Sequence, residues 1–376
     1  MKPIIIIGTG LAGYSLGREF RRLNSEQPLV FITADDGSSY SKPMLSNALA
    51  QGKDAQALVI AEAEKMRISL DASIMTNTRV EQIDAKGRRL YAGGEWLEYD
   101  SLVMATGAKP IHIPYAGEGA EDLISVNSLS DYAVYRERLG KAERVAIIGP
   151  GLIGCEFAND LLSQGKRVSV IGPDAYPIST LLPQEVGHSL QAALREQGVD
   201  WYLGTVVETI NRVDSGYLLA LKDGGQVVAD LVISAVGLVP DTHLATEAGL
   251  DTNRGIRVDS SLKSSLRGIY ALGDCAEVDG VNLPFVMPLM LGAKALAKTL
   301  AGEVTTVSYP IMPVVIKTPA CPVVAVPPPR EVEGAWEIDK NSGGVKALFR
   351  SVDKGLIGFA LCGSEVEQKA ELLKLM

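Results

Sequence analysis

A short stretch at the N-terminus decides the fold of the first part of the chain. Residues 4–13 read IIIIGTGLAG, four isoleucines followed by the pattern Gly-x-Gly-x-x-Gly. The apolar run is typical of a strand that is buried on both faces of a parallel sheet. In this pattern the first glycine allows a tight turn, the second lets a pyrophosphate approach the backbone, and the third lets helix pack against strand. The stretch therefore predicts a dinucleotide site at a helix N-terminus.

The residues that follow complete a β-α-β unit. Residues 11–23 carry apolar and small side chains at helical spacing and end in basic residues, and Leu29–Ile32 is a second apolar run. An acidic residue that binds the nucleotide ribose is expected about 20 positions after the motif, where Asp35 stands. By strand position the contact falls instead at Thr33 or Ala34. We therefore expect Thr33 or Ala34 to hold the ribose and keep Asp35 as the lesser candidate.

The same arrangement returns near the middle of the chain. Arg144–Ile148 predicts a strand, residues 149–154 read GPGLIG, residues 155–163 predict a helix, and residues 167–171 predict the next strand. A single Gly-x-Gly-x-x-Gly match is a weak signal. Two matches, each inside its own β-α-β unit, predict two dinucleotides bound in two duplicated folds.

The end of the second unit bears on the choice of nucleotide. Gly172 occupies the usual place of the ribose-binding acid, and Asp174 follows as the candidate ribose partner. No arginine stands where a 2'-phosphate would need one. NADH is therefore predicted in preference to NADPH.

The bulk composition is that of a multidomain enzyme. A chain of 376 residues predicts two or three domains. The net charge of −9 disfavours nucleic acid and anionic membranes as partners. Every apolar run is too short for a signal peptide core or a membrane span, so we expect a cytoplasmic protein without a transmembrane segment. The four cysteines and three histidines show no metal-ligand spacing, so no metal site is predicted.

Three further segments resemble the pyridine nucleotide-disulfide oxidoreductase family. Residues 103–107, VMATG, resemble the junction between its FAD and NAD domains, and residues 234–240, SAVGLVP, resemble the return crossing. Residues 269–275, IYALGDC, resemble its second FAD motif, in which the aspartate binds the ribityl chain. The resemblance implies an α/β protein with two Rossmann-like three-layer domains and a small α+β C-terminal domain. The expected domains are an FAD-binding domain (1–108 and 238–304), an NAD-binding domain (109–237) and a C-terminal domain (305–376).

Four segments are similar, more narrowly, to the rubredoxin reductase family. They are residues 40–46, YSKPMLS; 151–160, GLIGCEFAND; 286–290, VMPLM; and 315–322, VIKTPACP. This likeness implies hydride transfer from NADH to FAD, followed by single-electron transfer to rubredoxin, in the supply of an alkane hydroxylase system.

The motifs and the resemblance together give two sets of expected cofactor contacts. The expected FAD contacts are Gly8, Thr9, Gly10, Leu11, Ala12, Gly13, Thr33, Ala34, Lys42, Val80, Thr106, Gly107, Glu156, Asp274, Val286 and Lys317. The expected NAD contacts are Gly149, Gly151, Leu152, Ile153, Gly154, Asp174 and Gly237.

Three charged residues are expected to act on the flavin and nicotinamide. Lys42 would place a positive charge near the isoalloxazine, and Glu156 would pair with it and orient the nicotinamide amide. The alternatives are a solvated lysine and a carboxylate that satisfies the helix dipole. Lys317 is either an edge-strand charge or a donor to the flavin pyrimidine carbonyls, and the resemblance favours the donor.

The spacing of the cysteines bears on the route by which electrons would leave the flavin. Disulfide reductases of this fold need two closely spaced redox cysteines, and this sequence has no such pair. Cys155 and Cys275 are expected to be inert core residues, so electrons would leave the flavin directly. Two alternatives stay open: a reductase for ferredoxin or oxygen, and an FAD-carrying binding or signalling protein with slow turnover. Candidates for a basic docking patch for rubredoxin are Arg18, Arg21 and Arg22.

Overall fold

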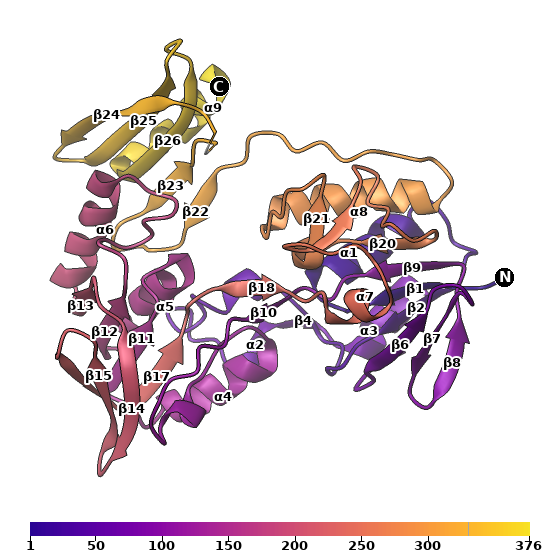
Figure 1. The fold of residues 1–376 in the computed structure, drawn as a ribbon, viewed down its shortest axis with the longest axis horizontal. Helices are drawn as coiled ribbons and strands as arrows, with labels where there is room; N and C mark the ends of the chain where they lie inside the picture. The colour runs from indigo at the N-terminus through magenta and orange to yellow at the C-terminus, as the bar shows by residue number, and fades with distance from the viewer. Residues whose placement is uncertain (330) are drawn as a thin grey trace. The chain divides into compact units, whose positions relative to one another are not determined.

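The computed structural model describes residues 1–329 and 331–376, which form two compact units (Figure 1). The first unit comprises Met1–Lys42, Ala57–Lys109 and Leu238–Pro310. The second unit comprises Pro43–Gln56, Pro110–Gly237 and Ile311–Met376. Both units contain a parallel sheet, which confirms the α/β class. The finer division into three domains at the predicted boundaries stays a prediction.

The first unit is built around a five-stranded parallel sheet with strand order β20-β9-β1-β2-β5. Its central strand β1 (Ile4–Ile7) is buried at every position, as its apolar run predicts for a strand covered on both faces. The other strands are β2 (Leu29–Ile32), β5 (Ser73–Met75), β9 (Ser101–Met104) and β20 (Ile269–Ala271).

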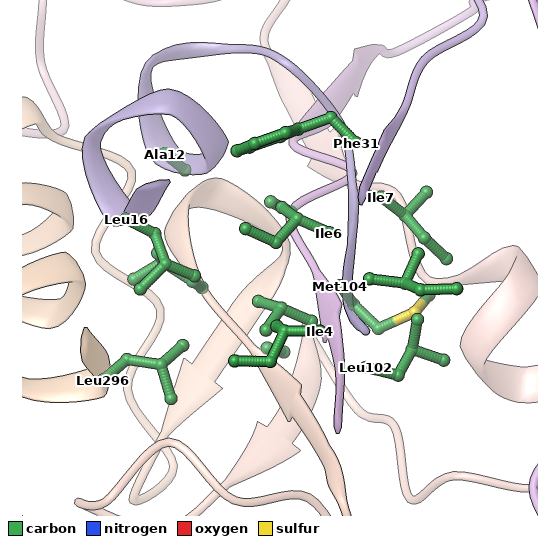
Figure 2. Close-up of a cluster of buried hydrophobic side chains, with 14 of the residues drawn as sticks. Ile4, Ile6, Ile7, Ala12, Leu16, Phe31, Leu102, Met104 and Leu296 are labelled. Atoms are coloured by element: carbon green, nitrogen blue, oxygen red, sulfur yellow. The ribbon is translucent and has the colours of Figure 1, made fainter. Parts of the chain in front are cut away.

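Two long helices, α1 (Leu11–Arg21) and α8 (Val286–Leu300), pack against each other and against this sheet. Figure 2 shows Leu16 of α1 and Leu296 of α8 beside Ile4 and Ile6 of β1. Helix α1 begins at the predicted residue and ends two residues early, because the chain turns after Arg21.

Smaller elements complete the first unit. An antiparallel meander, β6-β7-β8, contributes Ile83 and Leu90 to the same core. Residues 93–94 form the turn that joins β7 to β8. The remaining elements are β3 (Ser39–Tyr40), β4 (Val59–Ala61), α3 (Ala63–Leu70), β6 (Val80–Asp84), β7 (Arg89–Ala92), β8 (Glu95–Glu98), β18 (Leu238–Pro240), α7 (His243–Glu247), β19 (Ile256–Val258) and β21 (Ala276–Val278), while α2 (Ala55–Leu58) and β10 (Ala108–Pro110) lie at the boundaries of the unit.

The second unit repeats the same plan with a four-stranded parallel sheet, β13-β12-β11-β17. Helix α5 (Leu152–Leu162) begins three residues earlier than predicted, because the glycine turn ends at Gly151. The strands β14, β15 and β16 form an antiparallel meander. The elements are α4 (Leu129–Leu139), β11 (Arg144–Ile148), β12 (Arg167–Gly172), α6 (Gln184–Glu196), β13 (Val199–Leu203), β14 (Val207–Val213), β15 (Gly216–Leu221), β16 (Gln226–Ala229) and β17 (Leu231–Ser234).

The second unit also holds a five-stranded antiparallel sheet from the C-terminal part of the chain, with order β22-β23-β26-β25-β24. Helix α6 contacts β13 of the parallel sheet and also β25 and β26 of this second sheet. The chain continues from β26 into a 3-10 turn, Ser364–Gln368, and then α9 (Lys369–Leu375). The strands are β22 (Val314–Ile316), β23 (Val323–Val326), β24 (Gly334–Asn341), β25 (Gly344–Ser351) and β26 (Leu356–Gly363).

No helix among residues 1–329 and 331–376 has both the length and the apolar character that a bilayer crossing demands.

Candidate functional site

The first glycine turn joins β1 to α1 and leaves an open cradle in its middle. Gly8 has φ +110°, and a Cβ there would lie 2.3 Å from the carbonyl oxygen of Ala105. A Cβ at Gly13 would lie 2.0 Å from the oxygen of Gly8, so both positions need glycine for packing. A Cβ at Gly10 would meet no atom within 4 Å. The open side of Gly10 at the start of α1 is where a pyrophosphate can approach the backbone amides.

The second glycine turn, between β11 and α5, has the same geometry. Gly149 has φ +113°, and a Cβ there would lie 2.4 Å from the oxygen of Ala235. A Cβ at Gly154 would lie 2.0 Å from the oxygen of Gly149, whereas Gly151 has no atom within 4 Å of its ideal Cβ. No side chain caps the helix at either Gly10 or Gly151. The two turns therefore provide equivalent phosphate cradles, one in each unit.

Asp35, the carboxylate that follows β2, is hydrogen-bonded to residues around its own turn. Asp35 accepts hydrogen bonds from the Thr33 hydroxyl at 2.5 Å, the Thr9 hydroxyl at 3.3 Å and the Gly37 amide at 3.0 Å. These bonds favour the role of a turn carboxylate for Asp35. The Thr33 side chain is buried beside it.

The corresponding place, Gly172 at the end of β12, is shaped by a proline. A Cβ at Gly172 would lie 2.1 Å from Cδ of Pro150, so no acidic side chain fits there. Asp174, two residues on, is half-buried and accepts a hydrogen bond from the Ser179 hydroxyl. Asp174 is therefore the carboxylate that this unit presents after the strand.

The second FAD motif lies in the first unit, in a 3-10 turn, Gly273–Cys275, that follows β20 and contacts α8. Burial raises the pKa of Asp274 above the ordinary value of an aspartate, and the positive charge of Lys42 acts in the opposite direction. Two predicted FAD residues thus act on one another. Val286 is the first residue of α8 and is partly exposed, and Val80 is the first residue of β6.

The strand end after β9 holds two more predicted residues. The Thr106 hydroxyl donates to the carbonyl of Asp241 at 2.8 Å, and Gly107 has φ +72°. Gly237 lies in residues 234–240, the segment that resembles the return crossing of the family. It has φ +112°, and its carbonyl accepts a hydrogen bond from the amide of Ile111 at 3.0 Å. Both glycines have a positive φ angle, which glycine adopts more readily than other residues. This explains why glycine stands at these two turns.

In the second unit, Glu156 is bound to Lys317. The Glu156 side chain is 1% exposed, and its Oε2 lies 3.0 Å from Nζ of Lys317. Its Oε1 accepts the backbone amide of Lys317 at 2.9 Å, and Oε2 also accepts the Ser46 hydroxyl at 2.5 Å. Nζ of Lys317 donates in addition to Ser46 at 2.9 Å and to the carbonyl of Pro43. A buried carboxylate is therefore matched with a cation and two further donors.

Asp160, one turn further along α5, binds the same segment, Pro43–Gln56. Its carboxylate accepts the amides of Leu49 at 3.0 Å and Ala50 at 2.8 Å. Burial raises the pKa of Asp160 to about 6, although the two amides and nearby Lys317 oppose the rise. Neither Ser46 nor Asp160 was predicted from the sequence. The spacing of Glu156 and Asp160 was the available signal, since residues four apart share a helix face.

The pairing of Lys42 with Glu156 is a relation between the two units and stays a prediction. Of the residues expected at a docking surface, Arg21 donates four hydrogen bonds to the backbone carbonyls of Leu70, Asn24, Gln27 and Asp71. Arg22 pairs with Glu19 at 2.5 Å. These bonds give Arg21 a structural role in holding its own unit together.

The residues present fit two dinucleotides on structural grounds. Each unit places an open glycine at an uncapped helix N-terminus, which is the arrangement that a pyrophosphate requires. The first unit adds the half-buried Asp274 and the charge of Lys42, and the second adds Asp174 after β12. These features suit FAD in the first unit and NADH in the second.

Comparison with known proteins supports the same reading. Residues 2–304 match the family described as pyridine nucleotide-disulphide oxidoreductase, and residues 306–376 match the family described as rubredoxin binding C-terminal domain. A rubredoxin-NAD(+) reductase of Alcanivorax borkumensis is 48% identical over 100% of this chain and 98% of its own length. A rubredoxin-NAD(+) reductase of Acinetobacter baylyi is 45% identical over 100% of this chain and 98% of its own length.

A solved structure shows the same fold. A ferredoxin reductase from Rhodopseudomonas palustris superimposes with a TM-score of 0.89 at 24% identity and covers 98% of this chain and 94% of its own. The resemblance to rubredoxin reductases that the sequence predicts is confirmed by the two full-length relatives. The chain belongs to the pyridine nucleotide-disulphide oxidoreductase family.

Proposed function

We propose that this chain is an FAD-dependent reductase that takes hydride from NADH and passes single electrons to rubredoxin. The match of its C-terminal residues to a rubredoxin-binding domain is the observation that carries the proposal. The relatives named rubredoxin-NAD(+) reductase, alike over their full length, support it. FAD can accept two electrons as a hydride from NADH and release them one at a time, as a one-electron acceptor such as rubredoxin requires.

The glycine turns hold the cofactors through backbone amides. In the first unit Thr9, Gly10, Leu11 and Ala12 would surround the FAD pyrophosphate, and Asp274 would accept a ribityl hydroxyl. In the second unit the amides after Gly151 would hold the NADH pyrophosphate, with Asp174 accepting from the ribose. The remaining cofactor contacts are proposed as the sequence predicts them.

Charged residues tune the site without classical acid-base chemistry. Lys42 is proposed to place a positive charge near the isoalloxazine, which favours the anionic reduced flavin, and Lys317 is proposed to donate to the flavin pyrimidine carbonyls. Glu156 fixes the position of Lys317 through both carboxylate oxygens. Since Nζ of Lys317 has Ser46 and Pro43 as further acceptors, its charge is held at one place. Hydride transfer then needs no proton relay from the protein.

Anaerobic stopped-flow spectroscopy tests the proposal. The holoenzyme is expected to lose its flavin absorbance rapidly with NADH and to regain it rapidly with rubredoxin, but slowly with ferredoxin or oxygen. Fast reoxidation by ferredoxin or oxygen would instead identify a reductase for those acceptors. Slow reduction by NADH would identify an FAD-carrying binding or signalling protein.

We also propose a cytoplasmic location and a role in supplying an alkane hydroxylase system. Both follow from the proposed use of NADH and rubredoxin. Deleting the gene is expected to impair growth on alkanes but not on the corresponding fatty acids, which enter metabolism after the hydroxylation step.

A further inference from the structure

Two cysteines that are far apart in the sequence lie together in the C-terminal sheet. Strands β23 and β26 are antiparallel, with Val323 opposite Cys362. The amide of Gly363 donates to the carbonyl of Pro322 at 3.0 Å, which extends the pairing by one residue. Cys321 lies in the turn directly before β23, two residues from Val323, and so close to the position of Cys362 on the neighbouring strand.

The two sulfur atoms interact directly. The interaction between the two thiols raises the pKa of Cys321 and lowers the pKa of Cys362. Burial acts in the opposite direction on the pKa of Cys362, while the Val345 amide, the Ser189 hydroxyl and the positive charge of Lys340 lower it further. These donors favour the thiolate form of Cys362, which is the nucleophilic form of a cysteine.

The other two cysteines differ from this pair. Cys155 and Cys275 are fully buried, and their thiols donate to the carbonyls of Pro150 at 3.5 Å and Met104 at 3.4 Å. Burial raises the pKa of both thiols. Both are core residues, as the sequence predicts, and they serve as internal references for the pair Cys321 and Cys362.

A small oxidant has a route to the pair. Cys321 is 7% exposed, and it lies in a turn in which Pro319, Ala320 and Pro322 are exposed. The Thr318 hydroxyl donates to the Cys321 carbonyl at 2.7 Å and so closes this turn. Opening of this one turn exposes the sulfur atoms, whereas reaching Cys155 or Cys275 requires the opening of a Rossmann-like core.

We propose that Cys321 and Cys362 form a reversible dithiol–disulfide couple that is oxidised by hydrogen peroxide. The Cys362 thiolate attacks one peroxide oxygen, takes up one proton and releases water, which leaves a sulfenic acid on Cys362. The Cys321 thiol then attacks that sulfur, an S–S bond forms, and a second water leaves with the thiol proton and the sulfenic hydroxyl. Two electrons pass from the two sulfur atoms to the peroxide, and a small dithiol reverses the reaction.

The segment that carries Cys321 is hydrogen-bonded to α5, the helix that carries Glu156, in the same unit. The amides of Lys317 and Ala320 donate to Glu156 at 2.9 Å and Asn159 at 3.1 Å, so the turn that ends at Cys321 is anchored on α5. A disulfide would join this turn covalently to β26. The inference goes beyond the proposed electron transfer, and its test does not depend on rubredoxin.

The test is thiol counting and peptide mapping on the FAD-loaded full chain. Before treatment, four thiols react with a maleimide under denaturing conditions, since the chain has four cysteines. After brief treatment with hydrogen peroxide we expect the loss of one pair of thiols, its return with dithiothreitol, and a tryptic peptide starting at Thr318 linked to one starting at Gly355. Survival of all four thiols, or a link that involves Cys155 or Cys275, would overturn the proposal.

Two variants test the order of the steps. In Cys321→Ser the Cys362 sulfenic acid has no resolving thiol, so dimedone should label Cys362 after peroxide treatment. In Cys362→Ser the remaining Cys321 should react with peroxide at least tenfold more slowly, because its thiolate partner is gone. Equal rates in the two variants would contradict Cys362 as the attacking sulfur, and the wild-type disulfide measurement stands even if a variant folds poorly.

Discussion

Glu156 and Asp160 lie one turn apart on the same face of α5, and each binds a different part of the segment Pro43–Gln56. Glu156 accepts the Ser46 hydroxyl at 2.5 Å, whereas Asp160 accepts the amides of Leu49 and Ala50. This segment follows Lys42 directly. The helix that begins at the second glycine turn thus also fixes the segment that follows Lys42 in the sequence.

Changing Glu156 to Gln should destabilise the second unit. The backbone amide of Lys317 would keep an acceptor, but its ammonium group would lose its charged partner. Removing one member of a buried ion pair lowers stability because the other charge is left uncompensated. Lys317 is partly exposed, so we expect about 1–3 kcal/mol and a lower midpoint of thermal unfolding. Circular dichroism measures the midpoint.

A double-mutant cycle with Lys317→Met provides the control for this change. If the two side chains interact, the double variant should be less destabilised than the sum of the single variants by about 1 kcal/mol. Strict additivity would show that the contact between Glu156 and Lys317 contributes nothing to stability.

Changing Asp160 to Asn should alter the pH dependence of stability. The pKa of Asp160 is raised to about 6 in the folded protein, above the 3.8 of a free aspartate, so its protonated form is favoured by folding. Its contribution is fully present below pH 3.8 and is lost as the pH rises through 6. The stability of wild type relative to Asp160→Asn should therefore fall by at most about 3 kcal/mol between pH 4 and pH 7.

Asp230→Asn is the matched control for the pH series. Arg144 lowers the pKa of Asp230 to about 2, so the contribution of this group is present above pH 3.8 and is lost as the pH falls through 2. Between pH 5 and pH 7 the difference between wild type and Asp230→Asn should be flat. A flat difference for Asp160→Asn as well would contradict the raised pKa. Urea unfolding at each pH gives both differences.

Alanine at Gly151 should weaken nicotinamide nucleotide binding without unfolding the protein. The new methyl group would meet no protein atom within 4 Å and would stand in the phosphate cradle. We expect a rise in the Kd of NAD+ of about tenfold, equivalent to about 1.4 kcal/mol, by isothermal titration calorimetry of the FAD-loaded protein.

Two other glycines serve as controls for this substitution. Gly154→Ala places a Cβ 2.0 Å from the oxygen of Gly149 and should lower stability by about 2 kcal/mol or more. Gly10→Ala should weaken FAD binding and leave the Kd of NAD+ unchanged in the FAD-loaded protein. Unchanged NAD+ affinity in Gly151→Ala would exclude this turn as the phosphate site.

Removing the carboxylate of Asp174 should reduce the preference for NADH over NADPH. A carboxylate near the ribose accepts hydroxyl hydrogen bonds and repels a 2'-phosphate, so the ratio of the two kcat/KM values should fall by about tenfold or more in Asp174→Ala. Steady-state kinetics with both nucleotides measures the ratio. Asp200→Ala removes an exposed carboxylate from β13 and should leave the ratio unchanged.

The sequence predicts the local parts of the fold well, because they depend on short-range patterns. The isoleucine run at Ile4–Ile7 forms the central strand of a parallel sheet, and both glycine turns lie between strand and helix. Strand Arg144–Ile148 has the predicted bounds. Apolar periodicity and glycine spacing depend on residues that are close together in the chain. They can therefore be recognised in a single sequence, without an alignment.

The pairs at the candidate site could not be predicted, because each joins distant parts of the chain. Glu156 meets Lys317, and Cys321 meets Cys362, only because strands and helices bring them together. The sequence shows that no two cysteines are close neighbours, but sequence separation does not determine distance in space. Helix spacing indicated that Glu156 and Asp160 share a face, whereas their partners in Pro43–Gln56 required the tertiary structure.

The contact between Gly172 and Pro150 limits how the coenzyme preference of this enzyme can be redesigned. An acidic or basic side chain introduced at Gly172, the last residue of β12, would collide with the ring of Pro150 in the second glycine turn. A single substitution at the customary specificity position would therefore damage the turn before it changed the preference. Engineering toward NADPH has to replace Pro150 together with Gly172, or work from the loop that carries Asp174 and Ser179.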